Sequence, residues 1–370
     1  MGVGKTTSRD IAERAGVSQA TVSRALRDSP LVRPETRQRI REIATELNYR
    51  VDRSAAGLRS RQSRTLALLI FEDPTSDDSQ INPFFLSMLG SVTRAAAAEG
   101  YDLLVSFQQL SEHWHLRYEA SNRADGIILL GYGDYVSYGE RLHALEDAGA
   151  HFVIWGPTVE DQPGLSVGCD NDLGGRLATE HLIKLGRRRI AFIGEASEHC
   201  PEFARRHAGY VDALRDAGLT VNAALQRDAD NREMAGADAI DNLLASGERF
   251  DAIVAASDLM AIGAIKALQD AGRSIPDDVA VVGFDDIPAA SYVTPALTTV
   301  HQDTIRAGAA LVDTVLNAIR GEPIGARLLA PTLVVRESCG GAFSAPGVAP
   351  DTPKDPNVRS NQRPARAARR

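Results

Sequence analysis

Lys and Arg side chains are concentrated near the start of this chain, and this placement indicates where it could bind phosphate groups. Residues 1–64 contain 14 Lys and Arg against seven Asp and Glu, a charge of +7. Residues 341–370 carry a charge of +4. Since the net charge of the whole chain is −8, residues 65–340 carry −19. Neutralising nucleic-acid phosphates requires locally concentrated positive charge, which the first 64 residues supply. The simpler interpretation of this segment is a solvent-exposed basic helix.

Residues that could perform catalysis or bind a metal ion form no recognisable set. The three cysteines lie far apart without a CxxC pair, which argues against a zinc knuckle or a disulfide framework. His113 and His115 have no partners at metal-ligand spacing, and no Ser-His-Asp combination is evident. The segment GVGKTT at 2–7 lacks the first glycine and the preceding strand of a phosphate-binding loop. We therefore predict no catalytic residue, no metal site and no cofactor.

Length and composition restrict the class of protein. A chain of 370 residues is long enough for two or three domains. Its 44% hydrophobic and 24% charged residues are typical of a soluble globular protein. No apolar run approaches the ~20 residues that a membrane span needs, and the N-terminus has no apolar signal segment. We therefore expect a cytoplasmic protein without a membrane partner.

The first 50 residues predict three short amphipathic helices. These helices are expected over 8–15, 18–26 and 34–48. Thr7 begins the first as a cap with Asp10 as its capping-box partner, and Gly16 ends it. Ser18 begins the second. Two short helices joined by a tight glycine-containing turn, with a third to close the core, are typical of the helix-turn-helix.

From residue 65 the pattern changes to an alternation of apolar strands and amphipathic helices. Strands are predicted over 66–71, 103–105, 126–130, 152–155, 190–193, 252–255 and 279–282. Helices are predicted over 84–99, 140–148, 173–185, 203–217, 233–245 and 259–271. Such alternation predicts doubly wound parallel sheets with right-handed crossovers. The strands are too many for one sheet, so we expect two α/β lobes after a small all-α headpiece.

Sequence blocks in a fixed order carry a family resemblance. The first contains AGVSQATVSRAL and, later, ETRQRIREIATELNYR. Six further blocks follow in this order: NPFF, ADGIILL, GGRLATEHLIKLGRRRIAFIG, DAIVAASDLMAIGAIKALQDAG, IPDDVAVVGFDDI and TPALTTVHQD. From about residue 6 to 338 the chain resembles LacI/GalR-type bacterial repressors. The resemblance implies a helix-turn-helix headpiece and a body similar to periplasmic sugar-binding proteins, with a ligand between its lobes.

On this resemblance the chain divides into four parts. We expect a DNA-binding headpiece over 1–50, a hinge helix or linker over 51–64, an effector-binding and dimerisation domain over 65–340, and a tail over 341–370. Within the domain, lobe 1 is expected over about 65–165 plus 295–322, and lobe 2 over about 166–294 plus 323–340. The tail is rich in Ala, Pro, Gly and Arg, a composition that predicts disorder. It has no leucine heptads that would indicate a tetramerising helix.

The resemblance also implies the residues that meet DNA. Its second helix would lie in the major groove, where Arg24 can bond a guanine edge, Gln19 can read adenine and Ala20 can touch a thymine methyl. Hydroxyl side chains would contact phosphates, which is also the alternative role of Arg24. The implied DNA-binding residues are Thr7, Ser18, Gln19, Ala20, Thr21, Ser23, Arg24, Tyr49, Ala55 and Leu58.

The predicted hinge departs from the family pattern. Leu58 stands at the position that inserts into the minor groove, where an apolar wedge between base steps bends DNA. Val51 and Asp52 replace a common Pro and Asn, and Ala56-Gly57 replaces an Arg-Ser pair. Gly57 costs about 1 kcal/mol of helix stability relative to Ala. We therefore expect weaker folding of this hinge on DNA than in its relatives.

Two charged residues are implied to grip the effector. Arg206 matches the arginine that holds the ligand, and Asp285, the first acid of GFDD, matches the facing carboxylate. A polyol suits this pair, because Arg offers a rigid fork of donors and Asp accepts from hydroxyls. The remaining candidates are Phe84, Phe85, Trp155 and Ser257. Aromatic faces pack against sugar rings, while ordinary core packing is the alternative for the aromatic residues.

The resemblance leads to one functional hypothesis and several alternatives. We expect a homodimeric repressor of carbohydrate-utilisation genes that binds a near-palindromic operator and responds to a small sugar-like effector. It would be cytoplasmic and associated with the nucleoid when bound to its operator. A purine or nucleoside effector is the first alternative. A sugar-binding protein without DNA function and an enzyme on an α/β scaffold are the others.

Overall fold

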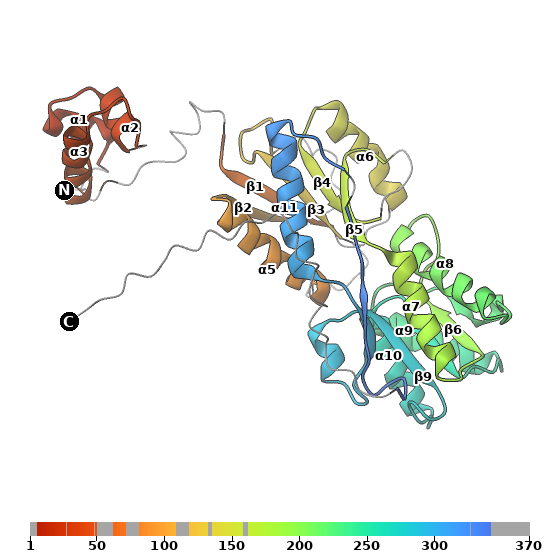
Figure 1. Cartoon of the computed structure of the whole chain (residues 1–370). Coiled ribbons are helices and arrows are strands. Elements are labelled where there is room, and N and C mark those ends of the chain that lie inside the picture. The colour runs from red at the N-terminus through yellow and green to blue at the C-terminus, as the bar shows by residue number, and fades with distance from the viewer. Residues whose placement is uncertain are drawn as a thin grey trace, which may run out of the picture.

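A computed structural model gives the conformation of most of the chain. It describes residues 6–26, 28–47, 49, 62–71, 81–108, 118–131, 135–157, 162–325 and 327–341. Figure 1 shows a small helical headpiece at the N-terminal end and an α/β body of two lobes. Most of the predicted hinge (51–61) and of the tail (342–370) lies outside the described residues. Within the described ranges, no helix is long and apolar enough to cross a membrane.

The headpiece consists of three helices around a small apolar core. They are α1 (Ser8–Ala15), α2 (Gln19–Leu26) and α3 (Pro34–Glu46). Ile11, Val22 and Ile40, one from each helix, are fully buried in this core. Complete burial of three large aliphatic side chains contributes about 1.5–3 kcal/mol each, which is substantial for so small a unit.

Capping residues fix both ends of α1 and the start of α2, and with them the turn between these helices. The backbone N–H of Thr7 donates to the Asp10 carboxylate at 2.7 Å, which closes the predicted capping box. Gly16 ends α1 with a φ of +67°, a left-handed conformation that glycine adopts without a steric penalty. The Ser18 hydroxyl accepts from the backbone N–H of Thr21 at 3.2 Å and caps α2. The predicted helix-turn-helix is confirmed.

Lobe 1 is a six-stranded parallel sheet with helices on both faces. Its strands are β1 (Thr65–Phe71), β2 (Asp102–Gln108), β3 (Gly126–Leu130), β4 (Phe152–Trp155), β5 (Leu165–Cys169) and β11 (Arg327–Leu329), in the order β11-β5-β4-β3-β1-β2. Its helices are α5 (Pro83–Ala98), α6 (Tyr135–Asp147) and α11 (Thr304–Arg320). Leu66 and Leu68 of β1 pack on the side of α5 and α11, whereas Ala67 and Leu69 pack on the side of α6. Burial on both faces explains why this strand is apolar throughout.

Lobe 2 has a second six-stranded sheet. Its strands are β6 (Ile190–Ile193), β7 (Gln226–Arg227), β8 (Ala252–Ala255), β9 (Ala280–Asp285), β10 (Thr298–His301) and β12 (Thr332–Val334), in the order β12-β10-β9-β8-β6-β7. All pairs are parallel except β10 with β12. The helices are α7 (Asn171–Lys184), α8 (Pro201–Asp216), α9 (Glu233–Ala245) and α10 (Asp258–Asp270), with short 3-10 turns η2 (Ala223–Leu225) and η3 (Pro288–Ser291). α7 packs against α8, and α9 against α10.

Glycine allows α7 and α8 to approach backbone to backbone. A Cβ at Gly175 of α7 would overlap the carbonyl oxygen of Arg206 in α8. A Cβ at Gly209 of α8 would overlap the carbonyl oxygen of Asp172 in α7. This reciprocal contact fixes the backbone of α8 at Arg206, one of the predicted effector residues.

The chain passes between the lobes three times, at 169–171, 301–304 and 329–332. The predicted fold class is confirmed, but these crossings correct the predicted lobe boundaries. β5 (165–169) and β11 (327–329) belong to the sheet of lobe 1, and β10 (298–301) belongs to that of lobe 2. These strands are short and contain polar residues, so their apolar pattern does not reveal which sheet they join. Helix α11, which packs against α5, was also not predicted.

Candidate functional site

The exposed surface of α2 carries the predicted base-reading residues. Gln19, Ala20 and Arg24 are all exposed, whereas Val22 and Ala25 of the same helix are fully buried. Gln19 Nε2 donates to Ser8 Oγ at 3.1 Å, which holds the amide over the start of α1. The headpiece core therefore fixes this helix with its polar side outward, as insertion into a DNA groove requires.

The predicted phosphate contacts lie around this helix. Ser18 Oγ and Thr21 Oγ1 are 2.9 Å apart at its N-terminus, and Thr7 is exposed at the start of α1. Tyr49 is half-buried against the headpiece core. Ser23 is half-buried on α2, and Ala55 and Leu58 lie outside the described residues. The DNA contacts of all these residues remain predictions.

Arg206 is a buried cation on α8 of lobe 2. Its side chain is only 1% exposed, and Nη1 lies 3.7 Å from Asp285 Oδ1. The guanidinium lies over the ring of Phe284 at 3.7 Å and near that of Phe203 at 5.2 Å. Nη1 also donates to the carbonyl oxygen of Ala256. Two aromatic faces and a carboxylate thus compensate for the lost hydration of this charge.

Asp285 faces Arg206 from a strained backbone. It ends β9 with a φ of +112°, a region that residues with a side chain rarely adopt. Its Oδ1 accepts from Gln302 Nε2 at 2.7 Å, and Gln302 lies in the second crossing between the lobes. Strain of this kind typically persists at binding sites, where the surrounding structure enforces it. The structure brings the predicted Arg206–Asp285 pair together.

Asn171 is a site residue that the sequence did not reveal. Its Oδ1 accepts from Arg206 Nε at 2.8 Å, and its Nδ2 donates to the carbonyl oxygen of Cys169 at 3.1 Å. Cys169 ends β5 in lobe 1, so this buried amide joins the arginine to the first crossing between lobes. The sequence signal was a polar Asp-Asn pair directly after a strand, where ligands bind in open parallel sheets.

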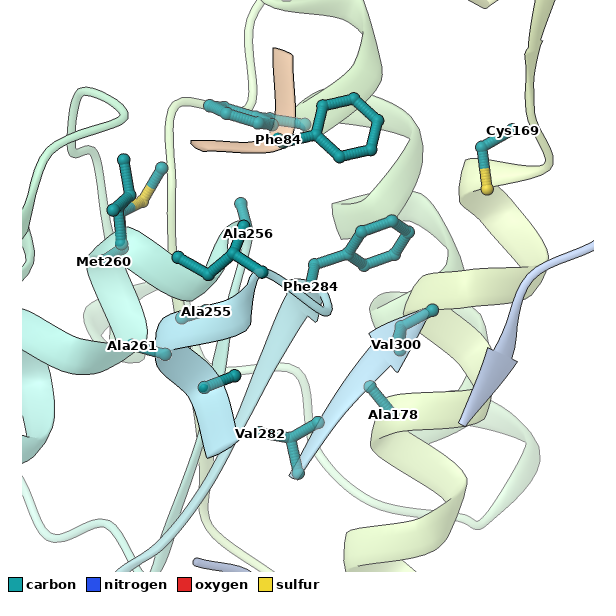
Figure 2. Packing of buried hydrophobic residues seen from close by; sticks show 14 of the residues in the cluster. Phe84, Cys169, Ala178, Ala255, Ala256, Met260, Ala261, Val282, Phe284 and Val300 are labelled. Carbon is teal, nitrogen blue, oxygen red and sulfur yellow. The ribbon is translucent and has the colours of Figure 1, made fainter. Parts of the chain in front are cut away.

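The predicted aromatic residues form a wall in lobe 1. Asn82 Oδ1 accepts from the backbone N–H of Phe84 at 2.9 Å, and Pro83 occupies the first turn, so the NPFF motif starts α5. The ring centroids of Phe84 and Phe85 are 5.4 Å apart, and those of Phe84 and Trp155 are 6.1 Å apart. Phe84 lies opposite Phe284 of lobe 2 in one continuous buried cluster (Figure 2).

Ser257 lies deeper than an effector contact would suggest. It is fully buried, and its Oγ accepts from the backbone N–H of Met260 at 3.3 Å as the cap of α10. A hydroxyl that accepts one bond can still donate another, so its effector contact remains a prediction. The next residue, Asp258, accepts from Ile287 N at 2.8 Å. Burial, followed by the neighbouring Asp285 carboxylate, raises the pKa of Asp258 well above its usual range.

A cavity of about 190 Å³ lies at the boundary of the lobes. Its lining includes Phe84 and Thr304 from lobe 1 and Asp285, Asp286 and Gln302 from lobe 2. Burial opposes ionisation of Asp286, but hydrogen bonds from His301 at 3.0 Å and Arg336 at 2.6 Å lower its pKa overall. The cavity thus places the aromatic ring of Phe84 beside acceptors and donors, the composition of a small-molecule site.

The comparisons with known proteins agree with this arrangement. Residues 7–52 match the family described as bacterial regulatory proteins, lacI family. Residues 179–339 match a periplasmic binding protein-like domain. The two parts define a class of protein: a DNA-binding regulator of transcription that carries a ligand-binding domain.

Individual relatives place the chain within that class. The transcriptional regulator CelR of Thermobifida fusca is 34% identical over 343 residues, which cover 90% of this chain and 98% of that protein. A solved CelR–cellobiose complex has a TM-score of 0.67 at 31% identity and covers 90% and 99% of the two chains. The Lac repressor dimer bound to operator and the anti-inducer ONPF has a TM-score of 0.77 at 26% identity over the same shares. The chain belongs to the LacI family; it is a transcriptional regulator and not an enzyme.

Proposed function

We propose that the protein represses carbohydrate-utilisation genes and that a small sugar-like effector between its lobes controls its affinity for the operator. The observation that carries the proposal is the Arg206–Asp285 pair beside the aromatic wall of Phe84 and Trp155. Hydroxyl groups match the charged pair, and the apolar face of a sugar ring matches the aromatic wall. The cellobiose held by the similar CelR supports this effector class.

Control of DNA affinity follows from the position of the cleft. Residues of both lobes line it, and Asn171 and Gln302 connect Arg206 and Asp285 to two of the three crossings. An effector that binds one lobe arrangement more tightly shifts the protein toward it. In our proposal this shift changes the spacing of the hinges that follow the headpieces, and with it operator affinity.

A homodimer on a near-palindromic operator completes the proposal. One short recognition helix reads few base pairs, and two-fold symmetry doubles the contacts. Exposed apolar residues lie on α5 and the neighbouring edge strand β2, where Leu86 is 47% and Phe107 49% exposed. The similar Lac repressor binds its operator as a dimer. With DNA as its partner, the protein would work in the cytoplasm, at the nucleoid.

A thermal-shift screen over sugars and nucleosides tests the effector proposal. The wild type, Arg206→Ala and the matched control Arg205→Ala are compared; Arg205 is an exposed neighbour that pairs with Asp172 at 3.7 Å. We expect a sugar to raise the Tm of the wild type and of Arg205→Ala but not of Arg206→Ala. Equal stabilisation of all three proteins contradicts the cleft assignment. Stabilisation by a purine or nucleoside alone contradicts the sugar class and supports the alternative effector.

A further inference from the structure

A second polar cluster lies at the lobe boundary, one helical turn from Arg206. Glu202, in the first turn of α8, is only 8% exposed. A Cβ at Gly156, the residue after Trp155 in lobe 1, would lie 3.2 Å from Glu202 Oε1. The carboxyl group therefore lies against lobe 1, next to the residue that follows Trp155. In the described part of the chain, it has no Lys, Arg or His partner within 4 Å.

Tyr135 approaches the same place from lobe 1. Its hydroxyl is buried and has no hydrogen-bond partner within the described ranges. Burial, and then the nearby Glu202, raises the pKa of Tyr135. Its backbone N–H donates to the carbonyl oxygen of His199 in lobe 2 at 2.9 Å, so the two lobes are in contact here. The Glu202 carboxyl accepts a hydrogen bond from its own backbone N–H, whereas the Tyr135 hydroxyl has no partner within the described ranges. The two groups, from opposite lobes, can therefore still accept or donate hydrogen bonds.

We propose that Glu202 and Tyr135 form a second subsite of the effector cleft, which binds hydrogen-bond donors of a neutral or cationic effector and excludes anionic ones. The inference rests on the proposed function and specifies its effector class. A buried carboxylate without a cationic partner is costly, and a ligand hydroxyl or ammonium group that donates to it reduces that cost. The tyrosine hydroxyl can donate to the same ligand or accept from it.

The charges of the cleft explain the exclusion of anions. Asp285 offsets the charge of Arg206, so the pair offers no surplus positive charge to a phosphate or a carboxylate. Ionised Glu202 adds a negative charge one turn away, and like charges in a partly desolvated site repel strongly. Sugar phosphates and uronic acids should therefore bind more weakly than the corresponding neutral sugars.

Paired probes test the inference on the full-length protein. Isothermal titration at pH 7.5 compares ribose with ribose 5-phosphate, glucose with glucuronate, cellobiose, glucosamine, and inosine with its monophosphate. The variants are Glu202→Gln, which keeps shape and removes charge, and Tyr135→Phe, which removes only the hydroxyl. Glu198→Gln is the matched control, because Glu198 is an exposed residue of the loop before α8.

We expect the wild type to bind a neutral or amino compound at least tenfold more tightly than its anionic counterpart. Glu202→Gln should lower the affinity for the neutral compound about tenfold, the usual contribution of a charge-assisted hydrogen bond. It should also reduce the discrimination against anionic compounds. Tyr135→Phe should lower the affinity for the neutral compound severalfold, and Glu198→Gln should leave this affinity unchanged.

Two results overturn the inference. If the wild type binds a neutral compound but Glu202→Gln leaves both its affinity and the discrimination unchanged, the subsite is wrong while the proposed function stands. If the wild type binds an anionic compound more tightly than its neutral counterpart, the subsite is likewise wrong while the proposed function stands. If no compound binds the wild type, the proposed effector class fails and the inference fails with it.

Discussion

At the scale of single residues, the cleft depends on a buried charge whose partners come from separate elements. Arg206 lies on α8, Asp285 at the end of β9, Asn171 at the start of α7, and Phe284 supplies an aromatic face. Removing one partner from such a pair leaves an uncompensated buried charge, which is more costly than the loss of a surface ion pair.

Asp285→Asn tests this arrangement. The substitution keeps shape and removes the charge that faces Arg206, so it should lower the free energy of unfolding by about 3–5 kcal/mol. Asp270→Asn, which removes one partner of the exposed Lys266–Asp270 pair, should cost less than about 1 kcal/mol. Urea unfolding of both variants measures the difference. Equal losses would contradict the buried ion pair.

A pH profile tests the burial of Glu202. Burial raises the pKa of its carboxyl to about 7. A hydrogen bond from its own backbone N–H and the positive charge of Arg206 lower the pKa, but by less than burial raises it. The folded protein then retains a proton that the unfolded chain releases near pH 4.5, so stability falls as pH rises from about 4.5 to 7. Glu202→Gln lacks this loss, and its stability relative to wild type should increase by up to about 3 kcal/mol across that window. Urea unfolding between pH 4.5 and 8, with Glu198→Gln as control, measures it; a constant difference would contradict the raised pKa.

At the scale of elements, the helix pair α7 and α8 positions the effector arginine. Gly175→Ala should force the two helices apart, because its Cβ would overlap the backbone of Arg206. We expect a loss of about 1–3 kcal/mol in stability and weaker effector binding. Gly139→Ala in α6 is the control: its Cβ would have open space, and alanine should stabilise that helix by up to about 1 kcal/mol. Chemical unfolding and effector titration measure both; similar effects of the two variants would contradict the close packing.

The same scale shows what the sequence could predict. Long apolar runs identified the central strands, and capping residues identified α1 and α2, because these signals are local. The short strands β5 and β10 were missed, since their sheet membership depends on distant partners. Arg206 and Asp285 were predicted from the family pattern. Asn171, Gln302 and Glu202 were not, because contacts with residues distant in the sequence give them their role.

At the scale of the whole molecule, the net charge of −8 conceals a basic headpiece and an acidic body. An acidic body disfavours contact with DNA away from the headpiece, which concentrates binding on α2. Two headpieces must then act together, so DNA affinity depends on the proposed dimer. Exposed apolar residues on an edge strand, such as Phe107 on β2, are typical of a surface that a partner covers.

Phe107→Lys should therefore convert the dimer to a monomer and weaken operator binding at least tenfold. Val136→Lys is the matched control, because Val136 is 51% exposed on α6, which covers the other face of the same sheet. Sedimentation velocity reports the oligomeric state of each variant. A monomeric wild type, or a Phe107→Lys protein that remains dimeric, would contradict the predicted interface.

Binding to the DNA upstream of the protein's own gene tests the central claim most directly. Fluorescence anisotropy at fixed salt compares the intact chain, Arg24→Ala and a chain without residues 1–64, each with and without a sugar that stabilises the wild type. We predict that the intact chain binds and that the sugar changes its Kd at least fivefold. Arg24→Ala should lose about five- to a hundredfold in affinity for this site, and the truncated chain should not bind. No binding by the intact chain at low salt, or undiminished binding without residues 1–64, would contradict the account.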